Sequence, residues 1–237
     1  MSTPQTAEYS RPPREIRNIF DQIASRYDFL NSFLSFNQDK SWRKKAVELS
    51  LRGSEKSILD IGTGSGAFLD EFLRRHTFGE AVGIDLSPEM LTLARRRLGS
   101  KAILLLSEGP RLSFQKDEFD IASSAFVLRS ISDILPFFKE VYRVLRPGGR
   151  FVILELTRPD QSLMKMLYRF YLKWYLPLAG RLFSGSRNAY QFLSNSIQKF
   201  YEVGEYVNFL KQAGFNPIQV HSMTGGVCTL VIAEKSK

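Results

Sequence analysis

The stretch from Ser57 to Leu73, SILDIGTGSGAFLDEFL, constrains the fold more than any other part of the chain. A short apolar run breaks into three glycines at alternate positions, and the apolar residues then resume with helical spacing. Glycine adopts backbone torsions that are closed to other residues and lets a ligand approach the backbone closely. The stretch therefore predicts a buried strand, a tight ligand-binding turn and a helix that starts at about Ser65.

Similar strand and helix patterns alternate along the rest of the chain. Strands are expected over 57–62, 80–85, 101–108, 119–126, 150–156, 217–223 and 225–235, and helices over 14–24, 41–51, 65–75, 87–98, 131–145 and 202–214. This order predicts one α/β domain over 1–237, with a doubly wound Rossmann-like parallel sheet, an antiparallel C-terminal edge and a helical cap over 1–50. Ligands bind such sheets at the switch point beyond the strand ends, which is where the glycine turn falls.

Charge and spacing distinguish between the possible ligands of this turn. The sequence has no GxxxxGK[ST] motif, and its glycines are spaced GxGxG rather than the GxGxxG that places a pyrophosphate on a helix N-terminus. Asp60 stands just before the turn, where a carboxylate repels phosphate and attracts an ammonium group. S-adenosylmethionine carries an amino group and a sulfonium and no phosphate. We therefore expect this cofactor on Gly62, Gly64 and Gly66.

Two acidic positions follow at the ends of later strands. Asp85 ends the second strand and can accept hydrogen bonds from both ribose hydroxyls. Because NAD enzymes place an acid at the same point, Asp85 alone does not discriminate, and an NAD-dependent oxidoreductase stays open as a less favoured alternative. Glu108 and Gly109 end the third strand and are expected near the adenine amine, although Glu108 could also be a solvated loop acid.

Composition limits the chemistry and suggests an anionic partner. One cysteine and two histidines leave little scope for a disulfide framework or a metal centre, and no metal is expected. The formal charge is +9, and basic residues gather among leucines and aromatics over 163–183. That segment suits either an amphipathic helix at a membrane surface or a lid with solvated lysines. Within 155–205 we expect a substrate- and membrane-facing insertion.

The N-terminus, MSTPQTAEYSRPPREIRNIF, lacks the apolar core of a signal peptide. The charges in 163–183 interrupt its apolar run too often for a membrane-spanning helix. We therefore expect a cytoplasmic protein with a peripheral contact at the inner face of the membrane.

Three separated motifs then point to one family. The segments YDFLNSFLSFNQDKSW (Tyr27–Trp42), LDIGTGSG and YRVLRPGGRFVILELTRP (Tyr142–Pro159) resemble the class I methyltransferases of quinol rings. The family is that of the demethylmenaquinone and 2-polyprenyl-6-methoxy-1,4-benzoquinol methyltransferases, and the C-terminal residues resemble it as well. The glycine turn alone marks only the superfamily, whereas the first and third motifs are far more specific to this family.

The sequence departs from the family pattern at positions close to the expected site. Glu108-Gly109 replaces Asp or Asn followed by Ala, and Ala125 replaces a serine that often precedes the phenylalanine of the FGLRN motif. In that motif Val127 replaces the glycine and Ser130 replaces the asparagine. These differences bear on the identity of the acceptor rather than on the class of reaction.

The resemblance implies S-adenosylmethionine-dependent C-methylation of a polyprenyl quinol, with demethylmenaquinol as the favoured acceptor. A benzoquinol of ubiquinone biosynthesis, both quinols, or another lipid or RNA acceptor are the alternatives, and nucleic acid is disfavoured by the apolar character of 163–183. The oligomeric state is not predicted. The implied catalytic residues are Arg129, Tyr27 and Asp28. The implied cofactor-binding residues are Asp60, Gly62, Gly64, Ser65, Gly66, Asp85, Glu108, Gly109 and Ala125.

Each implied catalytic residue also has a purely structural alternative. Arg129 is a poor base because a guanidinium stays protonated in proteins, so we expect it to stabilise a developing quinolate. It could instead form a structural ion pair with a nearby acid. Tyr27 could contact the methionine end of the cofactor or the quinol, or only pack, and Asp28 could accept a proton or cap a helix.

Overall fold

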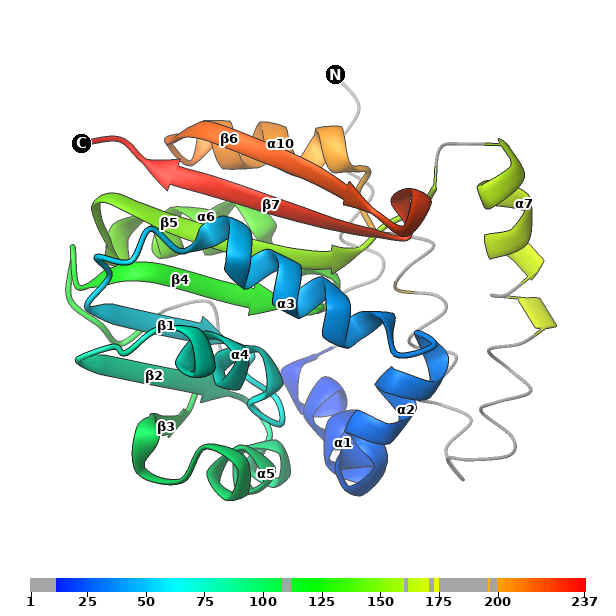
Figure 1. The fold of residues 1–237 in the computed structure, drawn as a ribbon, viewed down its shortest axis with the longest axis horizontal. Helices are drawn as coiled ribbons and strands as arrows, with labels where there is room; N and C mark the ends of the chain where they lie inside the picture. The colour runs from blue at the N-terminus through cyan, green and yellow to red at the C-terminus, as the bar shows by residue number, and fades with distance from the viewer. Residues whose placement is uncertain (1–11, 108–111, 160–161, 171–172, 175–195, 197–199) are drawn as a thin grey trace.

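A computed structural model describes residues 12–107, 112–159, 162–170, 173–174, 196 and 200–237. Among these residues, seven strands form a single mixed sheet in the order β3-β2-β1-β4-β5-β7-β6 (Figure 1). The five neighbouring strands β3, β2, β1, β4 and β5 pair in parallel. Strand β7 pairs with β5 on one side and β6 on the other, both in antiparallel register. The strands are β1 (Ser57–Ile61), β2 (Glu80–Asp85), β3 (Ile103–Leu106), β4 (Phe119–Ala125), β5 (Leu145–Leu156), β6 (Phe215–Met223) and β7 (Cys228–Lys235).

Helices cover both faces of this sheet, as the alternating pattern predicts. One face carries α3 (Gln38–Ser50), α4 (Ala67–Arg75) and α5 (Pro88–Leu98), and the other carries α6 (Ile134–Val144) and α10 (Val203–Gln212). Helices α1 (Pro13–Ile23) and α2 (Tyr27–Leu34) lie near the carboxyl ends of the parallel strands (Figure 1). The predicted α/β fold class is confirmed, and the switch between β1 and β4 places the glycine turn at this edge of the sheet.

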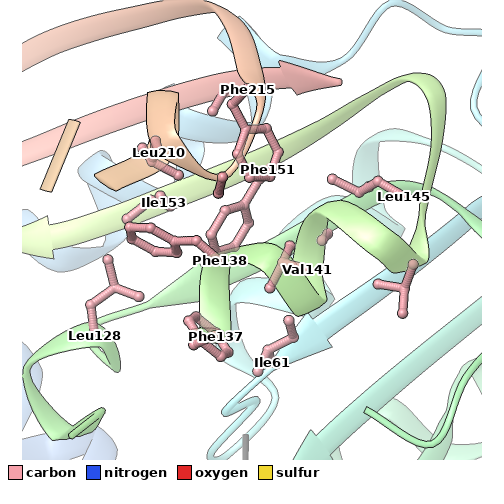
Figure 2. Close-up of a cluster of buried hydrophobic side chains, with 14 of the residues drawn as sticks. Ile61, Leu128, Phe137, Phe138, Val141, Leu145, Phe151, Ile153, Leu210 and Phe215 are labelled. Atoms are coloured by element: carbon pink, nitrogen blue, oxygen red, sulfur yellow. The ribbon is translucent and has the colours of Figure 1, made fainter. Parts of the chain in front are cut away.

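Alternating residues of the central strands build two hydrophobic cores. Phe151 and Ile153 of β5 pack with Phe138 of α6 and Leu210 of α10 (Figure 2). On the other face, Val152 of the same strand belongs to the core beneath α3 and α4. This two-residue period places the next odd position of β5, Glu155, on the α6 and α10 face near the carboxyl end of the strand.

Several local predictions from the sequence are observed. Ser87 caps α5, because its Oγ accepts a hydrogen bond from the Met90 N–H at 3.1 Å, and Pro88 is the first residue of the helix. Strand β5 differs from the prediction, since it begins at Leu145 rather than at Arg150. A register shift opposite Phe119 accommodates the RPGG segment as a bulge.

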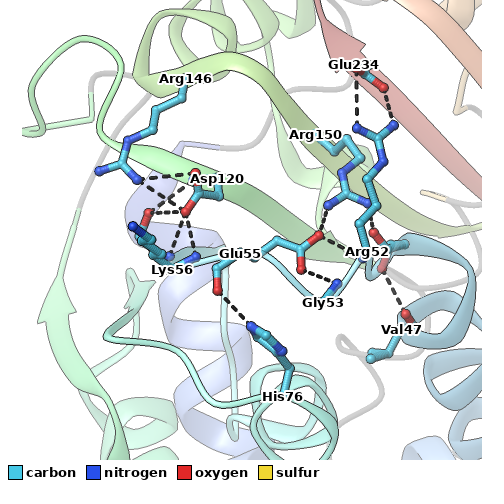
Figure 3. A network of polar contacts seen from close by, with 12 residues as sticks. Val47, Arg52, Gly53, Glu55, Lys56, His76, Asp120, Arg146, Arg150 and Glu234 are labelled. Atoms are coloured by element: carbon cyan, nitrogen blue, oxygen red, sulfur yellow. Dashed lines mark hydrogen bonds and ion pairs between the residues drawn. The ribbon is translucent and has the colours of Figure 1, made fainter.

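A polar network closes the amino-terminal edge of the sheet (Figure 3). The buried Arg150 guanidinium pairs with Glu55 and also donates to the Ser50 carbonyl. The Asp120 carboxylate accepts hydrogen bonds from the N–H groups of Lys56 and Ser57 at 2.7 and 3.0 Å. These contacts fix the loop before β1 at the edge opposite the glycine turn.

The predicted insertion is described only in part. Helix α7 (Ser162–Phe170) and residues Lys173 and Trp174 are described, whereas the remainder of 163–183 lies outside the described residues. In the described part of the chain, no helix is long and apolar enough to cross a membrane.

Candidate functional site

The glycine turn after β1 adopts a backbone that requires glycine. Gly62, Gly64 and Gly66 have φ values of +67°, +55° and +79°, a region that other residues seldom enter. At Gly62 a side chain would also lack space, because a Cβ there would lie 2.5 Å from Cγ2 of Val127. Thus Val127, where the family motif has glycine, packs directly against the turn.

Asp60 is the most deeply buried acid of the turn. Its Oδ1 accepts a hydrogen bond from Ser123 Oγ at 2.6 Å, while its Oδ2 has no partner among the described residues. Burial raises the pKa of Asp60 to about 6, and the negative charge of Asp85 acts in the same direction. The Oγ1 atom of Thr63 is also buried and lacks a partner within the described ranges. The Thr63 side chain nevertheless acts to lower the pKa of Asp60, so Asp60 Oδ2 and Thr63 Oγ1 lie together at the turn where a ligand would bind.

Asp85 connects the end of β2 to the turn. Its Oδ2 accepts a hydrogen bond from the Gly64 N–H at 2.8 Å, and its Oδ1 accepts one from the Ser87 N–H at 2.9 Å. Burial raises the pKa of Asp85 even though both amides act to lower it. A carboxylate oxygen has more than one acceptor site, so both oxygens can still accept hydrogen bonds from a ribose.

Tyr27 lies against the outer side of the turn. A Cβ on Gly64 would lie 3.8 Å from Tyr27 Cε1, and the Tyr27 ring meets that of Phe20 edge to face. Burial raises the pKa of the Tyr27 hydroxyl, while the positive charges of Arg129 and Arg43 oppose this shift. Tyr27 thus lies between the turn and a positively charged region, and its role toward the cofactor or the quinol stays a prediction.

Asp28 and Ser65 are held in a separate polar cluster. Ser65 Oγ donates to Asp28 Oδ1 at 2.5 Å, and Arg97 Nη2 lies 2.5 Å from Asp28 Oδ2. Arg97 Nη1 also donates to the Ser65 carbonyl at 2.7 Å. Asp28 therefore fastens α2 to the turn and is not the cap of a helix, while its catalytic role stays a prediction. Because the Ser65 hydroxyl is engaged here, a cofactor contact from Ser65 would come through its backbone.

Arg129 forms an ion pair with Glu155. The side chains are 8% and 0% exposed, and Arg129 lies in the short helix η4 (Leu128–Ser130) that follows β4. Glu155 Oε1 also accepts a hydrogen bond from the Leu156 N–H at 2.9 Å. The ion pair that was the structural alternative for Arg129 is thus observed. It also places a buried guanidinium at the same edge of the sheet as the glycine turn.

The N-terminal helices cover this edge with a second cation. Arg43 lies 5.5 Å from the ring centroid of Phe126, and its Nη1 pairs with Asp39 Oδ2 at 2.5 Å. Phe126 follows β4 with a φ of +63°, which is strained for an aromatic residue and typical of a functional site. Trp42 meets the same ring edge to face and donates from Nε1 to Thr224 Oγ1 at 2.9 Å.

Most of the predicted site residues converge at this edge. Ala125 is the last residue of β4, next to Phe126, whereas Glu108 and Gly109 lie outside the described residues. Sequence reasoning missed Thr63, the Asp39–Arg43 pair, and Glu155 as a member of the site. Two signals were available: Asp39 and Arg43 are spaced i, i+4, and Glu155 is an acid within an otherwise apolar strand.

The residues present fit S-adenosylmethionine. The unpartnered carboxylate oxygen of Asp60 suits an ammonium group, and Asp85 suits a ribose. The glycine backbone provides the close approach that the cofactor needs. No cluster of metal-binding side chains is present among the described residues.

Comparisons with known proteins agree with this geometry. A model of the ubiE/COQ5 methyltransferase family matches residues 7–235. The chain is 32% identical to a demethylmenaquinone methyltransferase of Staphylococcus saprophyticus, over 97% of this chain and 100% of the relative. It is 37% identical to the ubiquinone/menaquinone biosynthesis C-methyltransferase UbiE of Geotalea daltonii, over 93% and 96%. The predicted family resemblance and the predicted cofactor are thereby confirmed.

A solved structure shares the fold. The crystal structure of an S-adenosylmethionine-dependent methyltransferase from Thermotoga maritima, described as a possible histamine N-methyltransferase, superposes with a TM-score of 0.65. It is 18% identical, and the match covers 93% of this chain and 99% of that one. At this identity the likeness bears on the fold alone.

The space at Gly62 gives a first prediction. Gly62→Ala should lower the free energy of unfolding by about 1–3 kcal/mol more than Gly53→Ala, because overpacking against Val127 adds to the strain of a positive φ. Gly53 is the matched control, since it has a φ of +84° and no atom within 4 Å of a Cβ. Urea denaturation measures both changes. Adding Val127→Ala to Gly62→Ala should recover part of the loss, and equal costs at the two glycines would contradict the packing argument.

The pKa of Asp60 gives a second prediction. Since the pKa is about 6 in the ligand-free protein, Asp60 is neutral below that pH and cannot pair with an ammonium group. The affinity for S-adenosylmethionine should therefore fall about tenfold per pH unit below pH 6 and level off above it. Calorimetric titration from pH 5 to 8 measures this. Asp60→Asn should bind S-adenosylmethionine weakly, with an affinity that does not depend on pH. A wild-type affinity that does not depend on pH would show that Asp60 does not bind the ammonium group.

Proposed function

The chain belongs to the ubiE/COQ5 methyltransferase family, and on that premise we propose that it transfers a methyl group from S-adenosylmethionine to a ring carbon of a polyprenyl quinol. The acceptor that we propose is demethylmenaquinol. Relatives at 32–38% identity that cover most of the chain carry the name demethylmenaquinone methyltransferase or UbiE.

One observation supports this proposal above the others: the buried guanidinium of Arg129 at the carboxyl edge of the sheet. A quinol ring carbon becomes a good nucleophile when the neighbouring hydroxyl loses its proton, and that hydroxyl has an ordinary pKa of about 10. A fixed cation in a dry site stabilises the oxyanion far more than it would in water. Arg129 supplies such a cation.

The other residues of the site would bind the cofactor and exclude water. Asp60 would hold the amino group of the cofactor, and Asp85 would accept hydrogen bonds from the ribose hydroxyls. The backbone of the glycine turn would lie against the cofactor. The bound cofactor supplies an electrophilic methyl group. Tyr27 and Phe126 belong to the cover over this edge, which keeps the acceptor ring away from solvent.

The acceptor can be tested directly, and this is the third prediction. Labelled S-adenosylmethionine is supplied with reduced demethylmenaquinone or with a reduced demethylated ubiquinone precursor, side by side and without oxygen. We expect transfer to the naphthoquinol. Transfer to both quinols would mean that one enzyme serves both pathways. Asp60→Asn serves as the control that ties the signal to this site. Transfer to neither quinol, with cofactor binding intact, would overturn the proposal.

We also propose that helix α7 lies between the site and a membrane surface. On its inner side, Tyr168 is buried, and Met164 packs against the turn at Gly225, where a Cβ would lie 2.9 Å from its Cε. On its outer side, Met166 and Phe170 are 53% and 64% exposed, and Lys165 is exposed too. An apolar strip beside basic residues is typical of helices that lie in a lipid interface.

Nearby residues support the same face. Trp174 is 63% exposed, and Lys173 Nζ lies 5.6 Å from its ring centroid. Phe29 of α2 and Phe36 of the turn that follows α2 are also exposed. Helices α2 and α7 both lie at the end of the molecule where the parallel strands finish (Figure 1). A polyprenyl tail could pass from the site to the lipid at this end. The segment 155–205 would thus be the substrate- and membrane-facing part of the chain.

The fourth prediction concerns this face. The double variant Met166→Glu/Phe170→Glu should weaken binding to vesicles that contain phosphatidylglycerol by tenfold or more. Each of these side chains would contribute about 1.5–3 kcal/mol to binding when it is fully buried in the lipid. Sedimentation with vesicles measures this. Ile103→Glu is the matched control, since Ile103 is 54% exposed on the edge strand β3, away from α7. Unchanged vesicle binding of the double variant, or an equal loss in the control, would contradict the proposed orientation.

A further inference from the structure

Two buried Arg–Glu pairs among the described residues have carboxylates with different hydrogen bonding. At the amino-terminal edge, Glu55 pairs with Arg150, and the side chains are 2% and 6% exposed (Figure 3). Glu55 Oε1 also accepts a hydrogen bond from the Arg52 N–H at 2.8 Å, and Oε2 accepts one from the Gly53 N–H at 2.9 Å. Both oxygens of Glu55 are therefore satisfied, as expected of a structural buried carboxylate.

At the carboxyl edge, Glu155 is only half satisfied. Its Oε1 receives both Arg129 and the Leu156 N–H, whereas its Oε2 is buried without a hydrogen-bond partner anywhere in the described ranges. The pKa values follow this difference. Burial acts to raise the pKa of both acids. Backbone hydrogen bonds and Arg150 outweigh burial for Glu55, whose pKa is lowered. The pKa of Glu155 stays raised, although the Arg129 guanidinium, the Arg129 backbone and the Leu156 N–H all act to lower it.

Arg129 is the charged side chain that acts on Glu155. Glu155 in turn acts to raise the pKa of three groups on other elements: Tyr168 of α7, Tyr206 of α10 and Cys228 of β7. Burial raises the pKa of all three, so none of them carries a charge near neutral pH. The Tyr206 hydroxyl is also buried and unpartnered among the residues that the structure describes. This region thus combines one free acceptor, one free hydroxyl and one cation.

We propose that Glu155 is the catalytic base for the quinol: its Oε2 accepts the proton of the ring hydroxyl while Arg129 stabilises the oxygen that loses it. This inference rests on the proposed function. Arg129 cannot accept the proton, because a guanidinium remains protonated in proteins. Asp28 is a poorer candidate, because its two oxygens already contact Ser65 and Arg97.

The bonds balance without a further reactant. The quinol O–H bond breaks, its electron pair stays on oxygen, and the proton forms an O–H bond with Glu155. The neighbouring ring carbon then bonds to the methyl group as the S–CH3 bond breaks, with that bond's electron pair going to sulfur. Loss of the hydrogen on this carbon as a proton restores the aromatic ring. Return of the Glu155 proton to the ring oxygen leaves methylated quinol, S-adenosylhomocysteine and one proton.

The fifth prediction tests this base with a matched pair of variants. The assay uses saturating S-adenosylmethionine, so that ionisation of Asp60 does not affect the measured rate. Glu155→Gln should then lower kcat/KM for a short-tailed demethylnaphthoquinol by about 10²–10⁴-fold. Glu55→Gln removes the same charge from the other buried pair and should stay within about threefold of wild type. Circular dichroism and thermal unfolding establish that each variant folds.

The pH profile separates a base from a structural partner of Arg129. With wild-type protein, kcat/KM should fall about tenfold per pH unit below the raised pKa of Glu155, because only the carboxylate form accepts a proton. Glu155→Gln should lose this acidic limb, whereas Glu155→Asp should keep it at a reduced rate. If Glu155→Gln does not fold, the profile of Glu155→Asp decides, and a profile without the limb would overturn the proposal.

Binding of the quinol alone gives a readout that does not depend on turnover. Without S-adenosylmethionine and without oxygen, the affinity of the wild type for the naphthoquinol should weaken on acidification, and that of Glu155→Gln should not depend on pH. Quenching of tryptophan fluorescence follows the titration. If the wild type methylates quinols and Glu155→Gln keeps its rate and acidic limb, only the Glu155 inference fails. If the wild type methylates neither quinol, the proposed function fails as well.

Discussion

Three carboxylates at one edge of the sheet are desolvated, and two of them, Asp60 and Glu155, also have a buried oxygen without a hydrogen bond among the described residues. Asp60, Asp85 and Glu155 end or nearly end strands β1, β2 and β5, and burial raises the pKa of each. At the opposite edge, amide groups and arginines lower the pKa values of Glu55 and Asp120 despite their burial. Burying a carboxylate without a hydrogen-bond partner lowers the stability of the fold, and a bound ligand that supplies the missing partner offsets this loss.

Contacts from other elements hold that edge in place and bury it. The glycine turn bends closely enough for its Gly64 N–H to reach Asp85, and Asp28 fastens the N-terminal helices onto it through Ser65 and Arg97. Arg43 of α3 and Phe126, the residue that follows β4, lie against each other at the same edge. Excluding water strengthens each charge interaction that remains inside, so the cover and the chemistry depend on one another.

The sequence predicted much of this arrangement because strong local patterns carry it. The glycine spacing, the strand and helix periods, and Ser87 with Pro88 led to the fold, and Asp60 and Asp85 followed from their positions at strand ends. Glu155 was not recognised as a site residue, because its partners Arg129, Tyr168 and Tyr206 come from distant parts of the chain. The bulge at the start of β5 likewise depends on pairing with β4, which no local pattern specifies.

The ionisation of Asp60 and Glu155 can be followed directly in the ligand-free protein. Carbon-13 labelling of the carboxyl groups, with assignment through Asp60→Asn and Glu155→Gln, lets nuclear magnetic resonance follow each acid against pH. We expect Asp60 to titrate at about pH 6, Glu155 to titrate above its ordinary range, and Glu55 and Asp120 to titrate below theirs. Saturation with S-adenosylmethionine should lower the pKa of Asp60. Ordinary pKa values for Asp60 and Glu155 would show that this edge of the sheet does not hold desolvated acids.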